Sequence, residues 1–223
     1  MDQKNIQVFE DAAEEYDAWF DRHRFAYESE LQALKRFEPW GGKGLEIGVG
    51  SGRFASPLGV RFGVEPAKVM ARLARNRGLE IIRAYAEELP FKEQVFDFIL
   101  LVTVLCFLAD PSGALREATR VLKPRGRIII AMIDPDSPLG RAYEKNKEKS
   151  KFYRQARFHP VGEVLKWLET LGYVNLETCQ TIFQDPETIT AAEPVAEGHG
   201  AGVFVVIAGQ KSFRASPAKA NRP

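Results

Sequence analysis

Short, almost wholly apolar runs separated by amphipathic segments constrain the fold of this chain most strongly. Two of these runs, at 96–102 and 127–133, contain few polar residues, as expected of strands that are buried on both faces of a parallel sheet. The segment between them begins at Asp110 and ends at 123–126, and its apolar residues recur at helical spacing. This succession of strand, helix and strand predicts a βαβ unit.

The same alternation extends beyond this unit. Further strands are expected at 44–47, 59–64 and 79–83, and a helix at 66–77. The runs at 173–183 and 202–208 predict two more strands, and because no crossover helix fits between them we expect an antiparallel hairpin. The intervening loop, 184–200, has the length of a lid, a binding loop or a disordered segment. The pattern predicts a doubly wound, mostly parallel α/β sheet.

Three parts of the chain are expected. Phe9, Ala13, Tyr16 and Phe20 recur at helical spacing, which predicts an N-terminal helical cap over 1–40 with a break near Asp21. Residues 41–210 form the α/β domain. The stretch 211–223 carries basic residues and no acid, and is predicted to be a flexible, solvated tail.

The composition of the chain limits which binding partners and which cellular location we expect. The formal net charge is only +1 and the basic residues are spread along the 223-residue chain, which disfavours nucleic acid as a partner. The longest apolar run, 98–108, is shorter than the roughly 20 residues of a membrane-spanning helix, so we expect no span. Cys106 and Cys179 have no metal-binding or redox spacing, so we expect no metal and a reducing, cytoplasmic location.

A glycine-rich turn follows the first predicted strand. Gly48, Gly50 and Gly52 leave the backbone bare of side chains, so a ligand can approach it closely. The dinucleotide fingerprint requires a G-x-G-x-x-G spacing, and Arg53 occupies the position of its third glycine. The turn therefore disfavours a dinucleotide.

Acidic residues lie at the ends of the first two predicted strands. A carboxylate at Glu46 would repel a pyrophosphate at the following turn but would attract an ammonium group. Glu65 suits a carboxylate that accepts both hydroxyl protons of a ribose in the crevice beside the strand ends. Together they predict a nucleoside with an ammonium group and no phosphate. The alternative is that both acids lie at the surface beside flexible turns.

Seven segments of the chain carry a family likeness, in the order YDAW (16–19), LEIGVGSG (45–52), VEP (64–66), AEELPF (86–91), FDFI (96–99), RVLKPRGR (120–127) and GAGVFVV (200–206). With these motifs the chain resembles the class I S-adenosylmethionine (SAM) dependent methyltransferases, in particular the small-molecule branch that includes the ubiquinone and menaquinone biosynthesis methyltransferases. The likeness covers residues 9–210. It implies a seven-stranded Rossmann-like sheet with an antiparallel last strand, SAM as methyl donor and S-adenosylhomocysteine (SAH) as product.

The resemblance also implies the cofactor-binding residues. They are Tyr16, Glu46, Gly48, Gly50, Gly52, Glu65, Pro66, Ala86, Glu87 and Thr103. By this likeness Glu46 and the glycine turn line the methionine end of SAM, Glu65 holds the ribose and Pro66 packs on the adenine. Thr103 faces the methionine moiety.

One position departs from the family pattern. Tyr85 stands where the family usually has an Asp near the adenine amino group. Backbone groups of Ala86 and Glu87, or Tyr85 itself, would have to replace that contact.

The expected mechanism needs few catalytic side chains. A sulfonium methyl group is already activated, so transfer requires mainly an acceptor held in line and the exclusion of water. A base is needed only where the acceptor must lose a proton. His159, just before Pro160 at a helix start, is the candidate base, with capping of that helix as the alternative. Tyr16 is expected to close over the cofactor, with packing in the core as the alternative.

Other functions stay open at this point. The same pocket would suit a protein that binds SAM without methylating, and a related sheet would suit a nicotinamide dehydrogenase, which Glu46 and Arg53 disfavour. Residues 103–106 lack the Asn-Pro-Pro-Tyr type tetrapeptide of nucleic-acid methylation, so a small-molecule acceptor is expected. The chemistry of that acceptor does not follow from the sequence.

Overall fold

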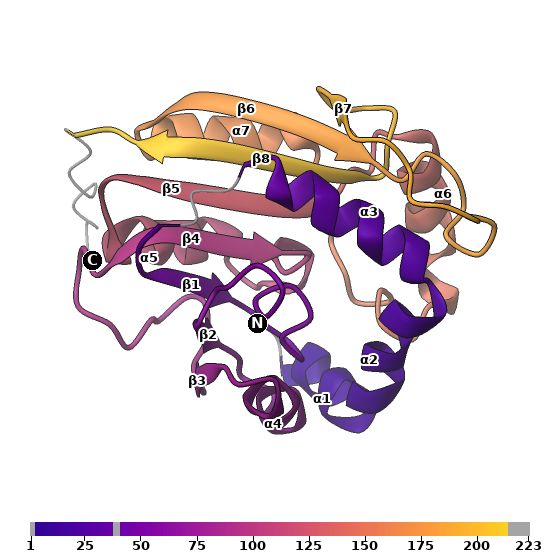
Figure 1. Ribbon diagram of the computed structural model, residues 1–223, viewed down its shortest axis with the longest axis horizontal. Coiled ribbons are helices and arrows are strands. Elements are labelled where there is room, and N and C mark those ends of the chain that lie inside the picture. The colour runs from indigo at the N-terminus through magenta and orange to yellow at the C-terminus, as the bar shows by residue number, and fades with distance from the viewer. Residues whose placement is uncertain (1–2, 38–40, 214–223) are drawn as a thin grey trace.

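An eight-stranded sheet forms the centre of the computed structural model, which describes residues 3–37 and 41–213. The strands are β1 (Gly44–Ile47), β2 (Phe62–Val64), β3 (Glu80–Ile82), β4 (Phe96–Val102), β5 (Leu122–Ile133), β6 (Tyr173–Thr181), β7 (Ala196–Glu197) and β8 (Phe204–Lys211). Their order across the sheet is β3-β2-β1-β4-β5-β8-β6-β7 (Figure 1). The expected Rossmann-like fold is confirmed, with a two-residue strand, β7, added by the loop after β6.

Parallel pairing covers the first five strands. Strand β8 then runs antiparallel to both β5 and β6, which confirms the predicted C-terminal hairpin. In Figure 1 the arrowheads of β1, β4 and β6 point toward α2 and α6, whereas that of β8 points the opposite way. The carboxyl ends of the parallel strands therefore meet at one edge of the sheet, where ligands bind in folds of this kind.

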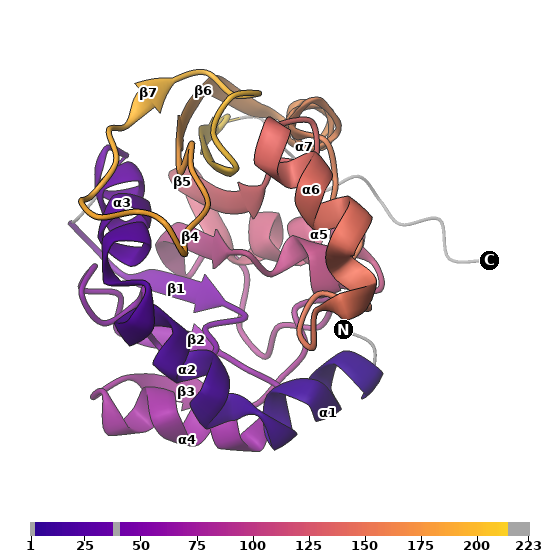
Figure 2. The same cartoon turned by 90° about the vertical axis from the view of Figure 1, so that its right-hand side faces the viewer.

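Helices cover both faces of the sheet. They are α1 (Gln3–Asp11), α2 (Ala13–Arg22), α3 (Arg24–Lys35), α4 (Lys68–Asn76), α5 (Pro111–Val121), α6 (Pro138–Asn146) and α7 (Val161–Thr170), with short 3-10 turns at Leu105–Phe107 and Lys147–Lys149. Buried side chains of α1 to α4 share one core cluster, and those of α5 and α7 share the other. Figure 2 looks onto the edge with the strand ends, and α1, α2 and α6 lie around it.

The N-terminal part is helical as predicted, but it contains three helices. The chain breaks at Ala12 and again at His23, close to the expected break at Asp21. Residues 38–40, which the expected cap also included, lie outside the described residues.

The boundary between α5 and β5 differs from the expected one. The helix ends at Val121 and β5 begins at once at Leu122, whereas we expected the helix to continue to 123–126 and the strand to begin at 127. Arg125 has a φ of 62°, and the β4–β5 register shifts between Phe96 and Phe98. An irregular strand entry of this kind, with a bulge beside Pro124, has no simple signal in hydrophobic periodicity.

The C-terminal boundary also differs. Lys211, assigned above to a solvated tail, is the last residue of β8 and is buried. Its Nζ donates to the carbonyl oxygens of Thr119 at 2.7 Å and Leu122 at 2.8 Å, so the strand is tied to the end of α5. Residues 214–223 of the predicted tail lie outside the described residues.

Candidate functional site

The glycine turn joins β1 to the segment before β2, and each glycine has a separate reason to be there. Gly48, Gly50 and Gly52 have φ values of 70°, 55° and 84°, a region that side chains disfavour. A Cβ on Gly48 would lie 2.3 Å from Val104, and one on Gly52 would lie 2.6 Å from Leu79. A Cβ on Gly50 would meet nothing within 4 Å. Gly48 and Gly52 therefore permit close packing, while Gly50 leaves bare backbone beside open space.

Glu65 directly follows β2 and is held by backbone donors. Its Oε2 accepts the Gly50 N–H at 3.0 Å, and its Oε1 accepts the Ala67 N–H at 2.8 Å. Burial raises the pKa of the Glu65 carboxyl to about 7, and these two N–H groups limit the rise. A carboxylate oxygen can accept more than one hydrogen bond, so Glu65 keeps acceptor capacity for a ligand hydroxyl.

Glu46 lies within β1 and is only 1% exposed. Its Oε2 is buried and has no hydrogen-bond partner among residues 3–37 and 41–213. Burial raises the pKa of this carboxyl well above its ordinary value, and Glu65 adds to the rise. The alternative that Glu46 and Glu65 are surface acids is wrong, since both are buried. An unpartnered, buried carboxylate oxygen fits a cationic ligand group.

The other expected cofactor residues also follow strand ends at this edge. Pro66 is half-buried between Glu65 and α4, and its carbonyl oxygen accepts from Arg83. Ala86 is buried and Glu87 is half-buried in the turn after β3. Tyr85 is 45% exposed.

Tyr16 and Thr103 lie together beside the glycine turn. They line a cavity of about 40 Å³ with Phe9, Gly48, Gly50 and Glu65, which we term the glycine-turn crevice. Ligand sites for small molecules usually measure about 300–1,000 Å³. The ring of Phe9 occupies part of this region and packs edge-on against Tyr16 at 5.3 Å and Phe107 at 5.2 Å. The crevice is therefore smaller than a typical ligand site in this arrangement, and Phe9 of α1 is one of the rings that narrow it.

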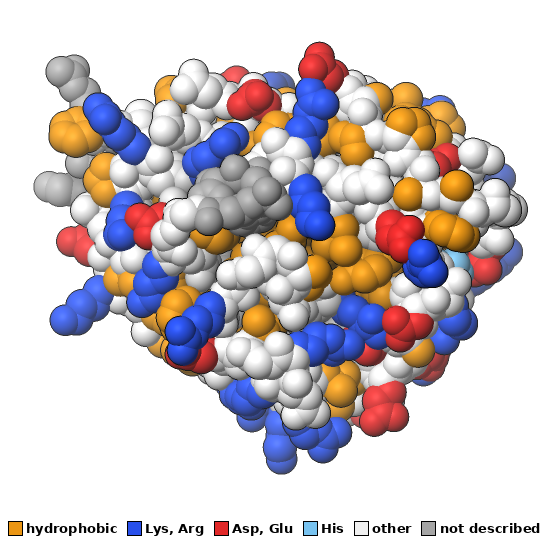
Figure 3. Space-filling view, viewed as in Figure 1, with side chains coloured by type: hydrophobic (Ala, Val, Ile, Leu, Met, Phe, Trp, Pro, Cys, Tyr) orange, Lys and Arg blue, Asp and Glu red, His pale blue; other side chains and the backbone are white. Residues whose placement is uncertain are grey.

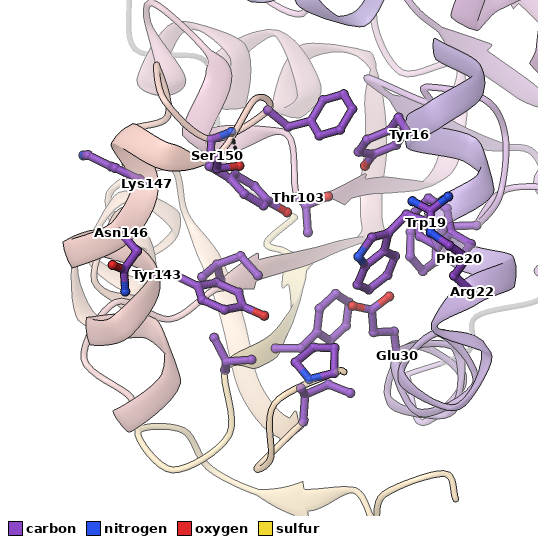
Figure 4. Close-up of a pocket in the computed structure, with 18 residues that line it drawn as sticks. Tyr16, Trp19, Phe20, Arg22, Glu30, Thr103, Tyr143, Asn146, Lys147 and Ser150 are labelled. Carbon is purple, nitrogen blue, oxygen red and sulfur yellow. Dashed lines mark hydrogen bonds between the residues drawn. The ribbon is translucent and has the colours of Figure 1, made fainter. Parts of the chain in front are cut away.

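A second cavity of about 300 Å³ adjoins the crevice, and we term it the aromatic cavity. Its walls come from the ends of β4, β5 and β6, the start of β8, helices α2, α3 and α6, and the loops that follow α6 and β6. Rings dominate the walls: Tyr16, Trp19, Phe20, Phe54, Tyr143, Phe152, Tyr153 and Phe204. Figure 4 shows the hydroxyl of Tyr143 pointing across the cavity toward Glu30.

The two cavities share Tyr16 and Thr103. Thr103 follows β4 directly and has a φ of 48°, and Ile182, at the end of β6 in the same aromatic cavity, has a φ of 60°. β-branched residues rarely adopt this region, and strained residues cluster at functional sites. Burial raises the pKa of the Tyr16 hydroxyl and the side chain of Thr103 limits the rise, which indicates that these two side chains face each other.

His159 lines neither cavity. It lines a separate void of about 10 Å³ whose walls also include Thr103. Its Nδ1 is 3.0 Å from an oxygen of Glu163, and its ring packs against Trp167. The contact with Glu163 joins His159 to the first turn of α7 through a side chain and not through a backbone N–H group. A catalytic role for His159 stays a prediction.

Salt bridges fix α2 to the glycine turn. Asp17 accepts from Arg53 at 2.8 and 2.9 Å and from Arg77 at 2.8 Å, and Asp21 accepts from Arg53 at 2.6 Å. Burial alone would raise the pKa of Asp17, but the hydrogen bonds from Arg53 and Arg77 contribute to lowering it to about 2. We term Asp17, Asp21, Arg53 and Arg77 the Asp17 clamp. Arg53 is the residue that occupies the third glycine position of the dinucleotide fingerprint. Through the Asp17 clamp, Arg53 positions α2, the helix that carries Tyr16.

The loop 184–200 is ordered against the N-terminal helices. The Glu193 N–H donates to Ser29 Oγ at 2.8 Å, and Glu187 lies 2.9 Å from His23. Pro186 lines the aromatic cavity. The alternative of a disordered loop is therefore wrong, and the loop closes one wall of the cavity.

Sequence reasoning missed most of the aromatic cavity. Glu30 could have been found, because it shares the predicted apolar helix face with Tyr27 and Leu34. Helix α6 could also have been found, because Ser137 and Pro138 are a typical helix start, and Ser137 Oγ accepts the Gly140 N–H at 3.0 Å.

Comparison with known proteins identifies the family. A family model described as a methyltransferase domain matches residues 45–130, which include the glycine turn, Glu65 and β4. A crystal structure from Thermotoga maritima, described as a SAM-dependent methyltransferase and possible histamine N-methyltransferase, is 50% identical. It covers 92% of this chain and 99% of its own with a TM-score of 0.90. This chain belongs to the SAM-dependent methyltransferases.

Two further proteins are similar to this chain. An uncharacterized protein of Methanocaldococcus jannaschii is 49% identical over 206 residues, which is 92% of this chain and all of that protein. A ubiquinone/menaquinone biosynthesis C-methyltransferase of Idiomarina loihiensis is 29% identical over 217 residues, covering 78% of this chain and 85% of its own. The family likeness read from the motifs is confirmed.

The residues around the glycine turn are suited to binding SAM. The unpartnered oxygen of Glu46 and the bare backbone at Gly50 are features that its amino acid part can use. Within the described part of the chain, no three His, Cys, Asp or Glu side chains are grouped so that they could hold a metal ion. No helix there is long and apolar enough to cross a membrane.

Proposed function

We propose that this methyltransferase transfers the methyl group of SAM to a small molecule bound in the aromatic cavity. The observation that carries the proposal is the wall shared by the two cavities, Tyr16 and Thr103. A donor beside Gly50 and an acceptor among the rings would meet there.

The chain's own residues would bind and orient the donor. Glu46 would hold the ammonium group of SAM, Glu65 the ribose hydroxyls, and the bare backbone at Gly50 the methionine part. Pro66 and the turn at Ala86 and Glu87 would surround the adenine. When bound, SAM supplies a methyl group on a positively charged sulfur. The rings of the N-terminal helices would exclude water from it.

The size and lining of the aromatic cavity favour a small acceptor. Its volume of about 300 Å³ falls at the lower end of the range for small-molecule sites. The formal net charge of +1, with basic residues spread along the chain, disfavours a nucleic acid, and over most of the face in Figure 3 Lys and Arg side chains lie among acidic and neutral ones. Both cysteines are free thiols, which supports a reducing, cytoplasmic location.

Transfer of labelled methyl groups tests this function. Protein is incubated with methyl-labelled SAM and a cell extract separated into small molecules, protein and RNA. We expect label only among the small molecules, and SAH binding by calorimetry. Label confined to macromolecules, or SAH binding with no transfer to any fraction, would contradict the proposal.

A cavity-filling variant locates the acceptor. Val203 lines the aromatic cavity and not the glycine-turn crevice, so Val203→Phe should lower transfer at least about tenfold and leave the Kd for SAH within about twofold. Val174→Phe is the matched control, since Val174 is 44% exposed on β6 and lines neither cavity. Equal transfer by both variants would place the acceptor elsewhere.

A further inference from the structure

Glu30 is the acid that lines the aromatic cavity. It belongs to α3, where its neighbours on the same face are apolar, and it is 9% exposed. Within residues 3–37 and 41–213 its carboxyl group has no hydrogen-bond or salt-bridge partner. Figure 4 shows that carboxyl group beside Trp19, directed into the cavity. A buried carboxyl group without a partner is costly for the fold, so its retention calls for an explanation.

No cation among the side chains that the structure describes compensates Glu30. Lys147 lines the cavity, but its Nζ donates to Glu144 at 2.6 Å and to the Ala156 carbonyl at 3.2 Å. Arg22 lines it as an exposed residue of α2 and forms no salt bridge with Glu30. Burial raises the pKa of the Glu30 carboxyl to about 8, with no lowering by a neighbouring cation.

The rings around Glu30 suit a cation as well. Trp19, Phe20 and Tyr143 present aromatic rings to the same cavity, and ring faces attract ammonium groups. A neutral apolar ligand would use the rings and leave Glu30 unpaired. An anion would gain nothing from Glu30, because a carboxyl group attracts it in neither protonation state. A small amine would use both features.

We propose that the acceptor is a small amine whose ammonium group is anchored by Glu30 among these rings, and that Glu30 then takes the proton which the nitrogen must lose. This inference rests on the proposed function and names the substrate class of that site. Glu30 takes one proton from the ammonium group. The freed lone pair forms the N–C bond, and the C–S bond of SAM breaks with its electron pair on sulfur. The products are SAH, the methylated ammonium and protonated Glu30.

Binding of matched ligand pairs tests the anchor without any turnover. Calorimetry with SAH present compares 2-phenylethylamine with 2-phenylethanol, butylamine with butanol, and benzylamine with benzyl alcohol. In each pair that binds, we expect the wild-type protein to prefer the amine by at least about tenfold. Wild-type protein that binds no amine of the series more tightly than its alcohol would overturn the inference.

A pair of helix variants assigns the effect to Glu30. Glu30→Gln should weaken amine binding at least about tenfold while leaving alcohol binding and the Kd for SAH within about twofold. Glu28→Gln is the control, because Glu28 lies on the same helix, pairs with Arg24 at 2.6 Å and does not line the cavity. If the two variants bound the amines with equal Kd values, the inference would be overturned.

The fate of the label separates the two proposals. Labelled small molecules that contain no basic nitrogen would refute the amine while the proposed function stands. Label found only in macromolecules would refute the proposed function itself. Labelled methylamines, together with kcat that falls in Glu30→Gln and shows an altered pH profile, would support both.

Discussion

Thr103 has a backbone conformation that its own side chain disfavours. Its φ of 48° is uncommon for a β-branched residue, and the strain costs about 1–3 kcal/mol. The Thr103 N–H is held by the carbonyl oxygen of Ala131 at 2.8 Å, so pairing between β4 and β5 maintains the strained geometry. The strain places a short, polar side chain between the two cavities.

Substitution of Thr103 by glycine separates strain from function. Glycine adopts positive φ freely, and this relief offsets the greater freedom of the unfolded chain. We expect Thr103→Gly to change the free energy of unfolding by less than about 1 kcal/mol and to lower the affinity for SAH about fivefold. Gln94→Gly, at an exposed turn with a φ of 57°, controls for the backbone effect. Denaturant titration and calorimetry measure both, and unchanged SAH affinity in Thr103→Gly would count against its place in the wall.

Glu65 predicts how cofactor affinity depends on pH. Its pKa of about 7 means that the carboxyl group of the free protein is protonated below that pH, and a protonated acid accepts ribose hydroxyls poorly. The Kd for SAH should therefore rise as the pH falls from 8 to 6. In Glu65→Gln, SAH binding should be at least about tenfold weaker at pH 8 and less dependent on pH. Glu80→Gln on β3, whose partner Arg61 is exposed, should behave as wild type.

At the scale of elements, the Asp17 clamp joins α2 to the turn after β1. Asp17 is its centre because its side chain is only 16% exposed, whereas that of Asp21 is 69% exposed. Charge-assisted hydrogen bonds at protected positions are the stronger ones. The clamp sets the position of Tyr16, one residue before Asp17 on the same helix.

Loss of the clamp should affect folding and binding together. We expect Asp17→Asn to lower the free energy of unfolding by roughly 2 kcal/mol and to weaken SAH binding, because two arginines lose their shared carboxylate. Asp21→Asn, at the exposed position, should cost less than about 0.5 kcal/mol. Urea titration compares the two variants, and equal losses would show that burial does not distinguish the two acids.

Which elements the sequence predicts well depends on burial. Strand β4 begins and ends where its apolar run does, because it is central and buried on both faces. Strand β2 is shorter than its run, 59–64, since Gly59 ends a turn and the strand begins only at Phe62. Strand β7 has no pattern of its own and forms only because the loop after β6 folds back onto that strand. Short or irregular strands depend on tertiary contacts, which the hydrophobic periodicity of the sequence does not show.

At the scale of the whole molecule, the sequence predicts the two halves of the site unequally. The donor half rests on residues at the ends of neighbouring strands, Glu46 and Glu65, and short-range motifs reveal them. The aromatic cavity is assembled from elements far apart in the chain, from Tyr16 to Phe204. Its rings read as ordinary core positions in every local window, so only the fold shows that they surround a void.

Three buried acids predict how overall stability depends on pH. The pKa values of Glu30, about 8, of Glu65, about 7, and of Glu46 all lie above their ordinary value of 4.5. The folded protein therefore binds more protons than the unfolded chain in this range, so stability is greatest below about pH 4.5 to 5 for these groups and is lost as the pH rises through 7 and 8.

Melting curves of the ligand-free protein check this dependence. The melting temperature should fall between pH 5.5 and 8.5, and Glu30→Gln should remove on the order of 2 kcal/mol of that fall. Glu28→Gln should keep the wild-type slope, since its side chain is paired at the surface. A melting temperature that rises over this interval would contradict the sign.

The closed glycine-turn crevice has a consequence for the order of events in a catalytic cycle. Only about 40 Å³ is free beside Phe9 and Tyr16, so in this arrangement the first two helices cover the glycine turn. Helix α1 is attached to α4 through Glu10, which accepts the N–H groups of Lys68 and Val69. We infer that release of the spent nucleoside requires this helix to detach from α4, and we expect the rate of that movement, rather than methyl transfer itself, to limit turnover.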